Sequence, residues 1–311
     1  MMQYALFARP VVTIYDLPQT IKEGEGKSVY PMQLAQGSTF NGFFNNYDGL
    51  ASGLQPIGVK YDDASRKVVC TLEQDDIMDG LNWLHKWYQD GIINPDANVV
   101  TDGGKGSIFG SAQGWPAAAT TWAFNQGIEK YDLTQVFGPL YTTETIQGSM
   151  NAISANSKYK TEALKVLQLM NTDPKFRDMC AYGTEGNYME YAEDGTVQKL
   201  RDDWNWPSYT QGTFFILSTQ ADGDPDAWNQ VKEQNESATS STCLGFALDV
   251  TNIQNEIANC NTVWDKYKND LLTGASDPAT AVPACIEELK AAGLDTVIEE
   301  AQKQVDEFFA N

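Results

Sequence analysis

The fold is indicated first by the run GSMNAISANSKYKTEALKVLQLMNTDP, residues 148–174. Its opening part, Ser149 to Ile153, predicts a β-strand. Thr161 to Asn171 then predicts an amphipathic helix, because four apolar residues recur at helical spacing on one face: Ala163, Leu164, Leu167 and Met170. A strand followed directly by a helix is typical of an α/β protein.

Upstream of this run the chain predicts a hairpin, a helix and one more strand. The hairpin joins residues 58–61 to residues 67–70 through a turn that contains Asp62, Asp63 and Ser65. Asp75 to Asp90 has helical periodicity and should end at Gly91, a residue that tolerates the left-handed conformation of a helix C-terminus. Val136 to Leu140 predicts a further strand.

The last hundred residues predict helices with almost no strand between them. The expected ranges are 225–238, 249–273, 277–292 and 295–309. Asp277 and Asp295 stand where N-terminal caps and first-turn residues belong, and Gly274 and Gly293 stand where helices end. The C-terminal region is therefore predicted to be mainly α-helical.

Composition limits the classes of partner. The 311 residues include 42 acidic and 21 basic side chains, a formal charge of -21, which disfavours nucleic acid and anionic membrane surfaces. No run of apolar residues is long enough to span a bilayer. The five cysteines have no metal-ligand or redox spacing, and their odd number leaves at least one thiol unpaired.

Most catalytic chemistry is also disfavoured. The only histidine, His85, lies within the predicted helix at 75–90 and is interpreted as structural. A metal site with two histidines, a nucleophile elbow and a phosphate-binding loop are all missing, so no metal, cofactor or catalytic residue is expected. Paired carboxylates remain the one catalytic grouping that the composition allows, as in a glycoside hydrolase.

Aromatic residues beside polar ones suggest saccharide binding, because a flat ring packs well against the C–H face of a sugar. The eight tryptophans provide candidates, with core packing as the alternative for each. A loop flanked by Gly183 and Gly186 provides others, with an ordinary surface turn as the alternative. The candidate ligand contacts are Trp115, Trp122, Trp204 and Trp206, together with Glu185, Asn187 and Tyr188 in the loop. Trp83, Trp87, Trp228 and Trp264 lie in predicted helices and are expected to be packing residues.

Several segments resemble the family 1 extracellular solute-binding proteins. Residues 148–174 are similar to that family's strand–helix unit that leads from the second lobe back into the first. YGTEGNY at 182–188, LGFALD at 244–249, LKAAG at 289–293 and QKQVDEF at 302–308 resemble the lipoprotein-type subgroup that carries a C-terminal DUF3502 domain.

The resemblance implies a periplasmic-binding-protein-like type II fold of two α/β lobes, here truncated at its N-terminus. It implies second-lobe structure in residues 1–140, the remainder of the first lobe in 141–215 and a helical region packed on the lobes in 216–311. The implied protein is a monomeric, extracellular lipoprotein that captures a mono- or oligosaccharide and delivers it to the permease subunits of an ABC importer. No signal peptide or lipobox cysteine is expected in this sequence. A carbohydrate-active enzyme is the alternative.

Overall fold

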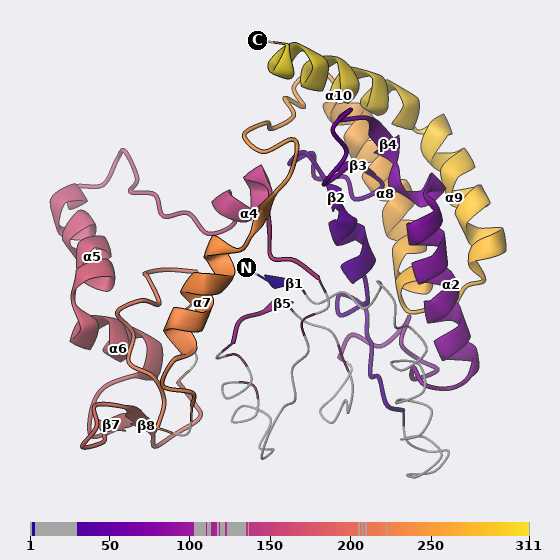
Figure 1. Cartoon of the computed structure of the whole chain (residues 1–311). Coiled ribbons are helices and arrows are strands. Elements are labelled where there is room, and N and C mark those ends of the chain that lie inside the picture. The colour runs from indigo at the N-terminus through magenta and orange to yellow at the C-terminus, as the bar shows by residue number, and fades with distance from the viewer. Residues whose placement is uncertain are drawn as a thin grey trace. The chain divides into compact units, whose positions relative to one another are not determined.

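The computed structural model describes residues 2–3, 30–102, 110, 113–116, 118, 122, 135, 137–204, 206, 208, 210–221 and 223–310 (Figure 1). The chain divides into two compact units. The larger unit comprises 2–113, 135–144 and 239–311, and the smaller unit comprises 114–134 and 145–238. Each unit is described separately below.

The larger unit contains a three-stranded antiparallel sheet in the order β2–β3–β4. Its strands are β2 Tyr47–Asp48, β3 Ile57–Lys60 and β4 Val68–Cys70. The predicted hairpin is therefore confirmed. Its turn is held by the carboxylate of Asp63, which accepts hydrogen bonds from the backbone N–H of Ser65 at 2.9 Å and of Lys67 at 3.0 Å. Such side-chain bonds to the following backbone are the reason that aspartate favours turns.

Helices form most of the other described elements of the larger unit. They are η1 Gly42–Asn46, η2 Thr71–Glu73, α2 Asp75–Gln89, α8 Gln254–Leu272, α9 Pro278–Ala291 and α10 Leu294–Phe309. Asp277 caps α9 by accepting from the backbone N–H of Ala279 at 3.0 Å. Gly293 adopts φ +110° between α9 and α10. The mainly helical C-terminal region is thus confirmed.

The prediction for the start of α8 was five residues too early. Asp249 does not begin a helix; its Oδ1 accepts from the backbone N–H of Thr251 at 2.9 Å and from the Thr251 hydroxyl at 2.6 Å. This local turn competes with the helix, as aspartate and threonine often do. The helix therefore begins only at Gln254.

One large core unites the sheet and these helices. On α2 the predicted apolar stripe is buried at Ile77, Leu81 and Leu84, and it shares this core with Trp264 of α8 and Leu289 of α9. Two pairs of short strands lie outside this sheet: β6 Leu140–Tyr141 pairs in parallel with β9 Thr239–Ser240, and β1 Met2–Gln3 pairs with β5 Gln113–Gly114.

The smaller unit is built around a helix pair and a hairpin. Its elements are α5 Lys160–Thr172, α6 Pro174–Tyr182, β7 Met189–Tyr191, β8 Val197–Lys199 and α7 Ala227–Glu236. The five-residue helix α4 Thr143–Gln147 lies at the boundary between the units. The small core of this unit contains Tyr182, Met189, Val197 and Leu217. The predicted helices at 161–171 and 225–238 are confirmed as α5 and α7.

Two predicted strands differ from the structure. Residues 149–153 have no regular secondary structure and form no backbone hydrogen bond with another described segment. The strand expected over 136–140 is confined to Leu140–Tyr141 in the described residues, and Val136 lies outside them. Pro139 has no N–H to donate, and it takes part in the pairing only through its carbonyl, which accepts from the backbone N–H of Thr239 at 3.1 Å. A strand also needs a neighbouring strand, which 149–153 does not have in the described chain.

Candidate functional site

Four aromatic rings of the smaller unit form a continuous row, here called the aromatic row. The ring of Trp122 meets Trp115 edge-on, with centroids 6.2 Å apart. Trp115 stacks on Phe214 at 5.9 Å, and Phe214 stacks on Trp228 at 4.9 Å with only 13° between the ring planes. All four side chains are half-buried rather than enclosed. The row therefore combines residues from distant parts of the sequence.

The structure brings together two sequence candidates, Trp115 and Trp122, and adds two residues that the sequence did not identify as candidates. Trp228 was expected to pack within a helix, and it does pack against the small core of this unit while it also ends the row. Phe214 was missed. It lies in an irregular segment without periodicity, and only its clustering with Phe215 and with Trp204 and Trp206 upstream signals an aromatic surface.

A second group, here called the Tyr188–Trp204 pair, consists of two more sequence candidates. The two rings lie 5.3 Å apart at 54°. The indole Nε1 of Trp204 donates to the backbone carbonyl of Cys180 at 3.0 Å, which fixes the orientation of that ring. The guanidinium of Arg201 lies 4.8 Å from the centre of the Tyr188 ring, within range of a cation–π contact.

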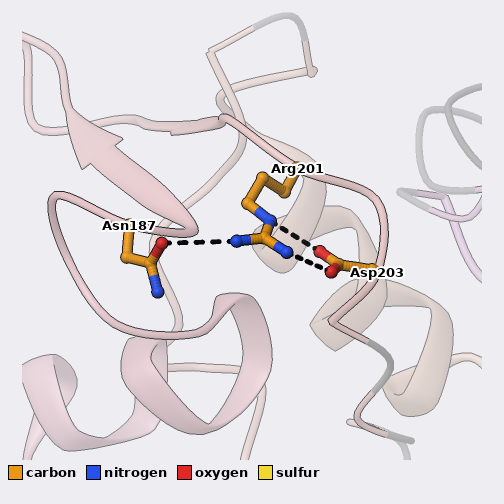
Figure 2. Close-up of polar contacts among 3 residues, drawn as sticks. All are labelled: Asn187, Arg201 and Asp203. Carbon is orange, nitrogen blue, oxygen red and sulfur yellow. Dashed lines mark hydrogen bonds and ion pairs between the residues drawn. The ribbon is translucent and has the colours of Figure 1, made fainter.

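Polar groups surround this pair (Figure 2). Arg201 Nε donates to Asp203 Oδ1 at 2.9 Å, and Nη2 donates to Asp203 Oδ2, which makes a two-pronged ion pair. Nη1 of Arg201 also lies 3.4 Å from Asn187 Oδ1. The pairing lowers the pKa of Asp203 and raises that of Arg201, so both stay charged at neutral pH. Planar donors and acceptors beside aromatic rings can bond sugar hydroxyls.

Helix α6 holds the chain segment that leads from Trp204 of the Tyr188–Trp204 pair to Phe214 of the aromatic row. Arg177 is fully buried, and it donates from Nε to the carbonyl of Thr213 at 3.0 Å and from Nη2 to the carbonyl of Ser208 at 2.8 Å. Its guanidinium also lies 5.7 Å from the centre of the Phe214 ring. Burial lowers the pKa of Arg177, yet the group remains charged because its ordinary value is so high. Arg177 therefore positions the backbone that presents Phe214.

Asp178, the next residue of α6, holds the same segment from a second point. Its carboxylate accepts from the backbone N–H of Ser218 at 2.9 Å, from the Ser218 hydroxyl at 2.7 Å and from the hydroxyl of Tyr191 at 2.9 Å. Burial and the Asp178 carboxylate together raise the pKa of Tyr191 well above its ordinary value. No sequence pattern marks Arg177 and Asp178 as buried, because adjacent opposite charges usually lie on a solvated surface.

The remaining sequence candidates are less closely connected. Glu185 is exposed and forms an isolated backbone bridge with Met189. Trp206 is half-buried, and no ring contact joins it to either aromatic group among the described residues. Its indole Nε1 is buried, as are those of Trp115 and Trp228, and none of the three has a hydrogen-bond partner in the part of the chain that the structure describes.

The described residues contain neither a group of side chains arranged as a metal site nor a helix suited to span a membrane. Across those ranges no group of three or more histidine, cysteine, aspartate or glutamate side chains is arranged to hold a metal ion. None of the helices described above combines the length and apolar character needed to cross a bilayer. His85 contacts the backbone carbonyl of Gly274 through Nδ1 at 2.8 Å in the larger unit.

Comparison with known proteins shows what the chain as a whole is similar to. Residues 242–310 match the family model described as a domain of unknown function, DUF3502. A carbohydrate ABC transporter substrate-binding protein of Streptococcus pneumoniae serotype 4 (strain ATCC BAA-334 / TIGR4) is 27% identical over 316 residues, which covers 96% of this chain and 63% of the relative. The chain thus spans less than two thirds of the length of that relative.

Solved structures show the same likeness. The crystal structure of the N-glycan transport solute binding protein NgtS from Streptococcus pneumoniae in complex with Man1GlcNAc matches with a TM-score of 0.80 and 25% identity, over 96% of this chain and 68% of that one. The same protein in complex with Man5GlcNAc matches with a TM-score of 0.79 and 25% identity, over 96% and 67%. The fold expectation is confirmed: this chain has the type II fold of the solute-binding proteins, it is similar to a substrate-binding protein of a carbohydrate ABC transporter, and its residues 242–310 match the DUF3502 model.

Proposed function

We propose that this chain captures a saccharide on the aromatic surfaces of its smaller unit and delivers it to an ABC importer. The observation that carries the proposal is the aromatic row, in which Trp115, Phe214 and Trp228 stack in succession. Rings that stack on one another hold each other in place, and the half-buried indole and phenyl groups give the C–H groups of sugar units an apolar partner at low entropic cost.

Polar groups near the rings can supply the hydrogen bonds to sugar hydroxyls that saccharide recognition also requires. Asn187, Arg201 and Asp203 lie beside the Tyr188–Trp204 pair and are exposed, so their remaining donors and acceptors can bond hydroxyls. Unpaired indole N–H groups on Trp115 and Trp228 favour any local rearrangement that brings an acceptor to them, since a buried donor without a partner costs about 1–3 kcal/mol.

The relatives support the class of ligand. NgtS is described as an N-glycan transport solute binding protein and was crystallised with Man1GlcNAc and with Man5GlcNAc. These two saccharides are therefore the first probes to use. In this proposal the chain is monomeric and non-catalytic, its partners are permease subunits, and the full-length protein is anchored outside the cell as a lipoprotein.

A calorimetric titration of the chain with Man1GlcNAc and Man5GlcNAc tests the proposal. Binding of either should be weakened at least tenfold by Phe214→Ala, because that ring stacks on both Trp115 and Trp228. The matched control is Phe215→Ala, which removes the adjacent, 54% exposed ring that lies outside the row. Equal effects of the two substitutions would contradict a role for the row.

The same mixtures distinguish capture from catalysis. After prolonged incubation, chromatography should recover both saccharides unchanged. Release of mannose or of N-acetylglucosamine would instead favour a glycoside hydrolase. The absence of heat with any saccharide, at concentrations up to the millimolar range, would overturn the proposed function.

A further inference from the structure

The open end of the β7–β8 hairpin brings Arg201 against Tyr188. The two strands pair through Met189 and Lys199, and one step beyond that pair the backbone N–H of Leu200 donates to the carbonyl of Tyr188 at 2.9 Å. Arg201 follows directly after this bond, and its guanidinium lies 4.8 Å from the centre of the Tyr188 ring. The register of two strands therefore sets the position of Arg201.

Two further contacts hold the surface around Arg201 in place. Gly183 adopts φ +90°, and a Cβ atom there would lie 2.5 Å from Tyr188 Cβ, so only glycine lets the backbone pack this closely against the tyrosine. The indole of Trp204 is fixed by its hydrogen bond to the carbonyl of Cys180. A surface that is positioned before the ligand arrives can discriminate between ligands, because it does not rearrange to suit the wrong one.

Asp203 occupies the edge of Arg201 that would otherwise bind a carboxylate of a ligand. The Nε and Nη2 groups of an arginine form a planar fork that matches a carboxylate at two points. Both donors of this fork go to the two carboxylate oxygens of Asp203, as Figure 2 shows. Because Asp203 is only two residues away in the same chain, it competes with a ligand carboxylate at high effective concentration. N–H groups that remain on Nη1 and Nη2 can donate to neutral oxygens.

The charges around this ion pair also disfavour an acidic ligand. Residues 185–203 contain six carboxylate side chains and only two cationic ones. Asp203 already neutralises Arg201, and the adjacent Asp202 is exposed. A ligand carboxylate would therefore meet an excess of negative charge, and such repulsion acts over a Debye length of about 8 Å at physiological salt. A neutral saccharide meets no repulsion of this kind.

We propose that Asp203 is a specificity-determining residue, which restricts the surface around the Tyr188–Trp204 pair to uncharged saccharides and excludes those with a carboxylate, such as uronic acids. This inference rests on the proposed function, because it concerns which saccharides that surface admits. Asp203 acts by occupying the guanidinium of Arg201, so its removal frees a fork for an acidic sugar and changes selectivity. An ion pair with only a structural role would, when broken, weaken the binding of acidic and neutral sugars alike.

Calorimetric titration with two matched disaccharides tests this inference. The neutral probe is Man1GlcNAc, and the acidic probe is the same disaccharide with C6 of its mannose oxidised to a carboxylate. The unaltered chain should bind the neutral probe at least tenfold more tightly. Asp203→Ala should narrow that ratio at least fivefold by tightening the binding of the acidic probe, because the fork of Arg201 is then free. Arg201→Gln added to Asp203→Ala should abolish the gain.

Asp202→Ala is the matched control. It removes the same charge from the adjacent exposed position and leaves the ion pair between Arg201 and Asp203 in place. It should narrow the ratio less than twofold. Equal narrowing by the two aspartate variants would overturn the inference, because the total charge rather than the occupied fork would then decide selectivity. An unaltered chain that binds the two probes equally well would overturn it too.

A second measurement decides the inference even if the unaltered chain binds neither disaccharide, an outcome that would count against the proposed function. Free mannuronate is titrated at millimolar concentrations while the NMR signal of the Arg201 Nε–H group is followed. That signal should shift in Asp203→Ala, and it should stay in place in the unaltered chain and in Asp202→Ala. A signal that ignores mannuronate in Asp203→Ala, or that shifts equally in all three proteins, would overturn the role of Asp203.

Discussion

The guanidinium of Arg177 lies 5.7 Å from the centre of the Phe214 ring and donates to the backbone carbonyl of Thr213, the residue immediately before it. This relationship joins a buried charge on α6 to the middle of the aromatic row. Because Arg177 is fully buried and its hydrogen bonds go to carbonyl groups, its role is structural: it sets the position of a ring that is proposed to contact ligand.

Arg177→Met should therefore reduce both stability and saccharide affinity. Loss of two charge-assisted hydrogen bonds leaves two part-buried carbonyls unpaired, at a cost of about 3 kcal/mol in the free energy of unfolding. Lys175→Met, an exposed position on the same helix, is the control and should change neither quantity appreciably. Urea denaturation with calorimetric titration measures the two effects. An unchanged free energy of unfolding would contradict this account of Arg177.

Gly212 should be essential for the close packing of Arg177 against the chain that leads to Phe214. It adopts φ +75°, and a Cβ atom there would lie 2.9 Å from Arg177 Nε and 2.9 Å from the carbonyl oxygen of Met170. Gly195 has a similar φ of +83° but open space around it. Gly195→Ala should cost about 1 kcal/mol from backbone strain alone, whereas Gly212→Ala should cost about 2 kcal/mol or more, since the clash is added. Equal costs would show that the close approach is tolerated.

His85 should contribute to stability without affecting binding. Its Nδ1 lies 2.8 Å from the carbonyl oxygen of Gly274, which links α2 to the turn after α8 within the larger unit. His85→Ala should lower the free energy of unfolding by about 1 kcal/mol. Asn82→Ala, an exposed position on α2, serves as the reference. A marked loss of saccharide affinity in the histidine variant would refute the structural interpretation.

The cysteines should differ sharply in reactivity toward a thiol reagent. Cys180 is half-buried, whereas the other four are buried, and burial raises the pKa of Cys70, Cys243 and Cys260 to about 11 and of Cys285 to about 12. The thiolate is the reactive form, so one group should react in the native protein and all five after urea treatment. Rapid reaction of two or more native thiols would contradict the buried arrangement.

The same buried thiols should make the protein less stable in alkali. A folded-state pKa above the ordinary value of 9.0 means that the folded chain retains protons that the unfolded chain loses. Their contribution is complete below that value and is lost as the pH rises toward about 11. Urea denaturation at about pH 8 and about pH 10 should show this fall, and Cys285→Ala should reduce it. A slope unaltered in that variant would exclude the contribution of Cys285.

The sequence by itself determined the regular elements whose signals are local. The stripe of α2, the turn at Asp63, the cap at Asp277 and the glycine at 293 all depend on residues within a few positions of one another, and the structure has each where it was predicted. The candidates Trp115, Trp122, Tyr188 and Trp204 were also visible as aromatic residues in polar or glycine-rich stretches. The division into 1–140, 141–215 and 216–311 stays a prediction.

Only the tertiary structure decided which aromatic candidates lie together and which residues hold them in position. Phe214 enters the aromatic row, and Arg177 lies buried beneath it, through contacts between residues far apart in the sequence, and periodicity carries no information about such contacts. The failure at 149–153 has the same cause: a strand pattern specifies an alternation of side chains, but a strand exists only where another supplies its hydrogen bonds. The local sequence set the preference for a strand, and the presence or absence of a neighbouring strand decided whether one formed.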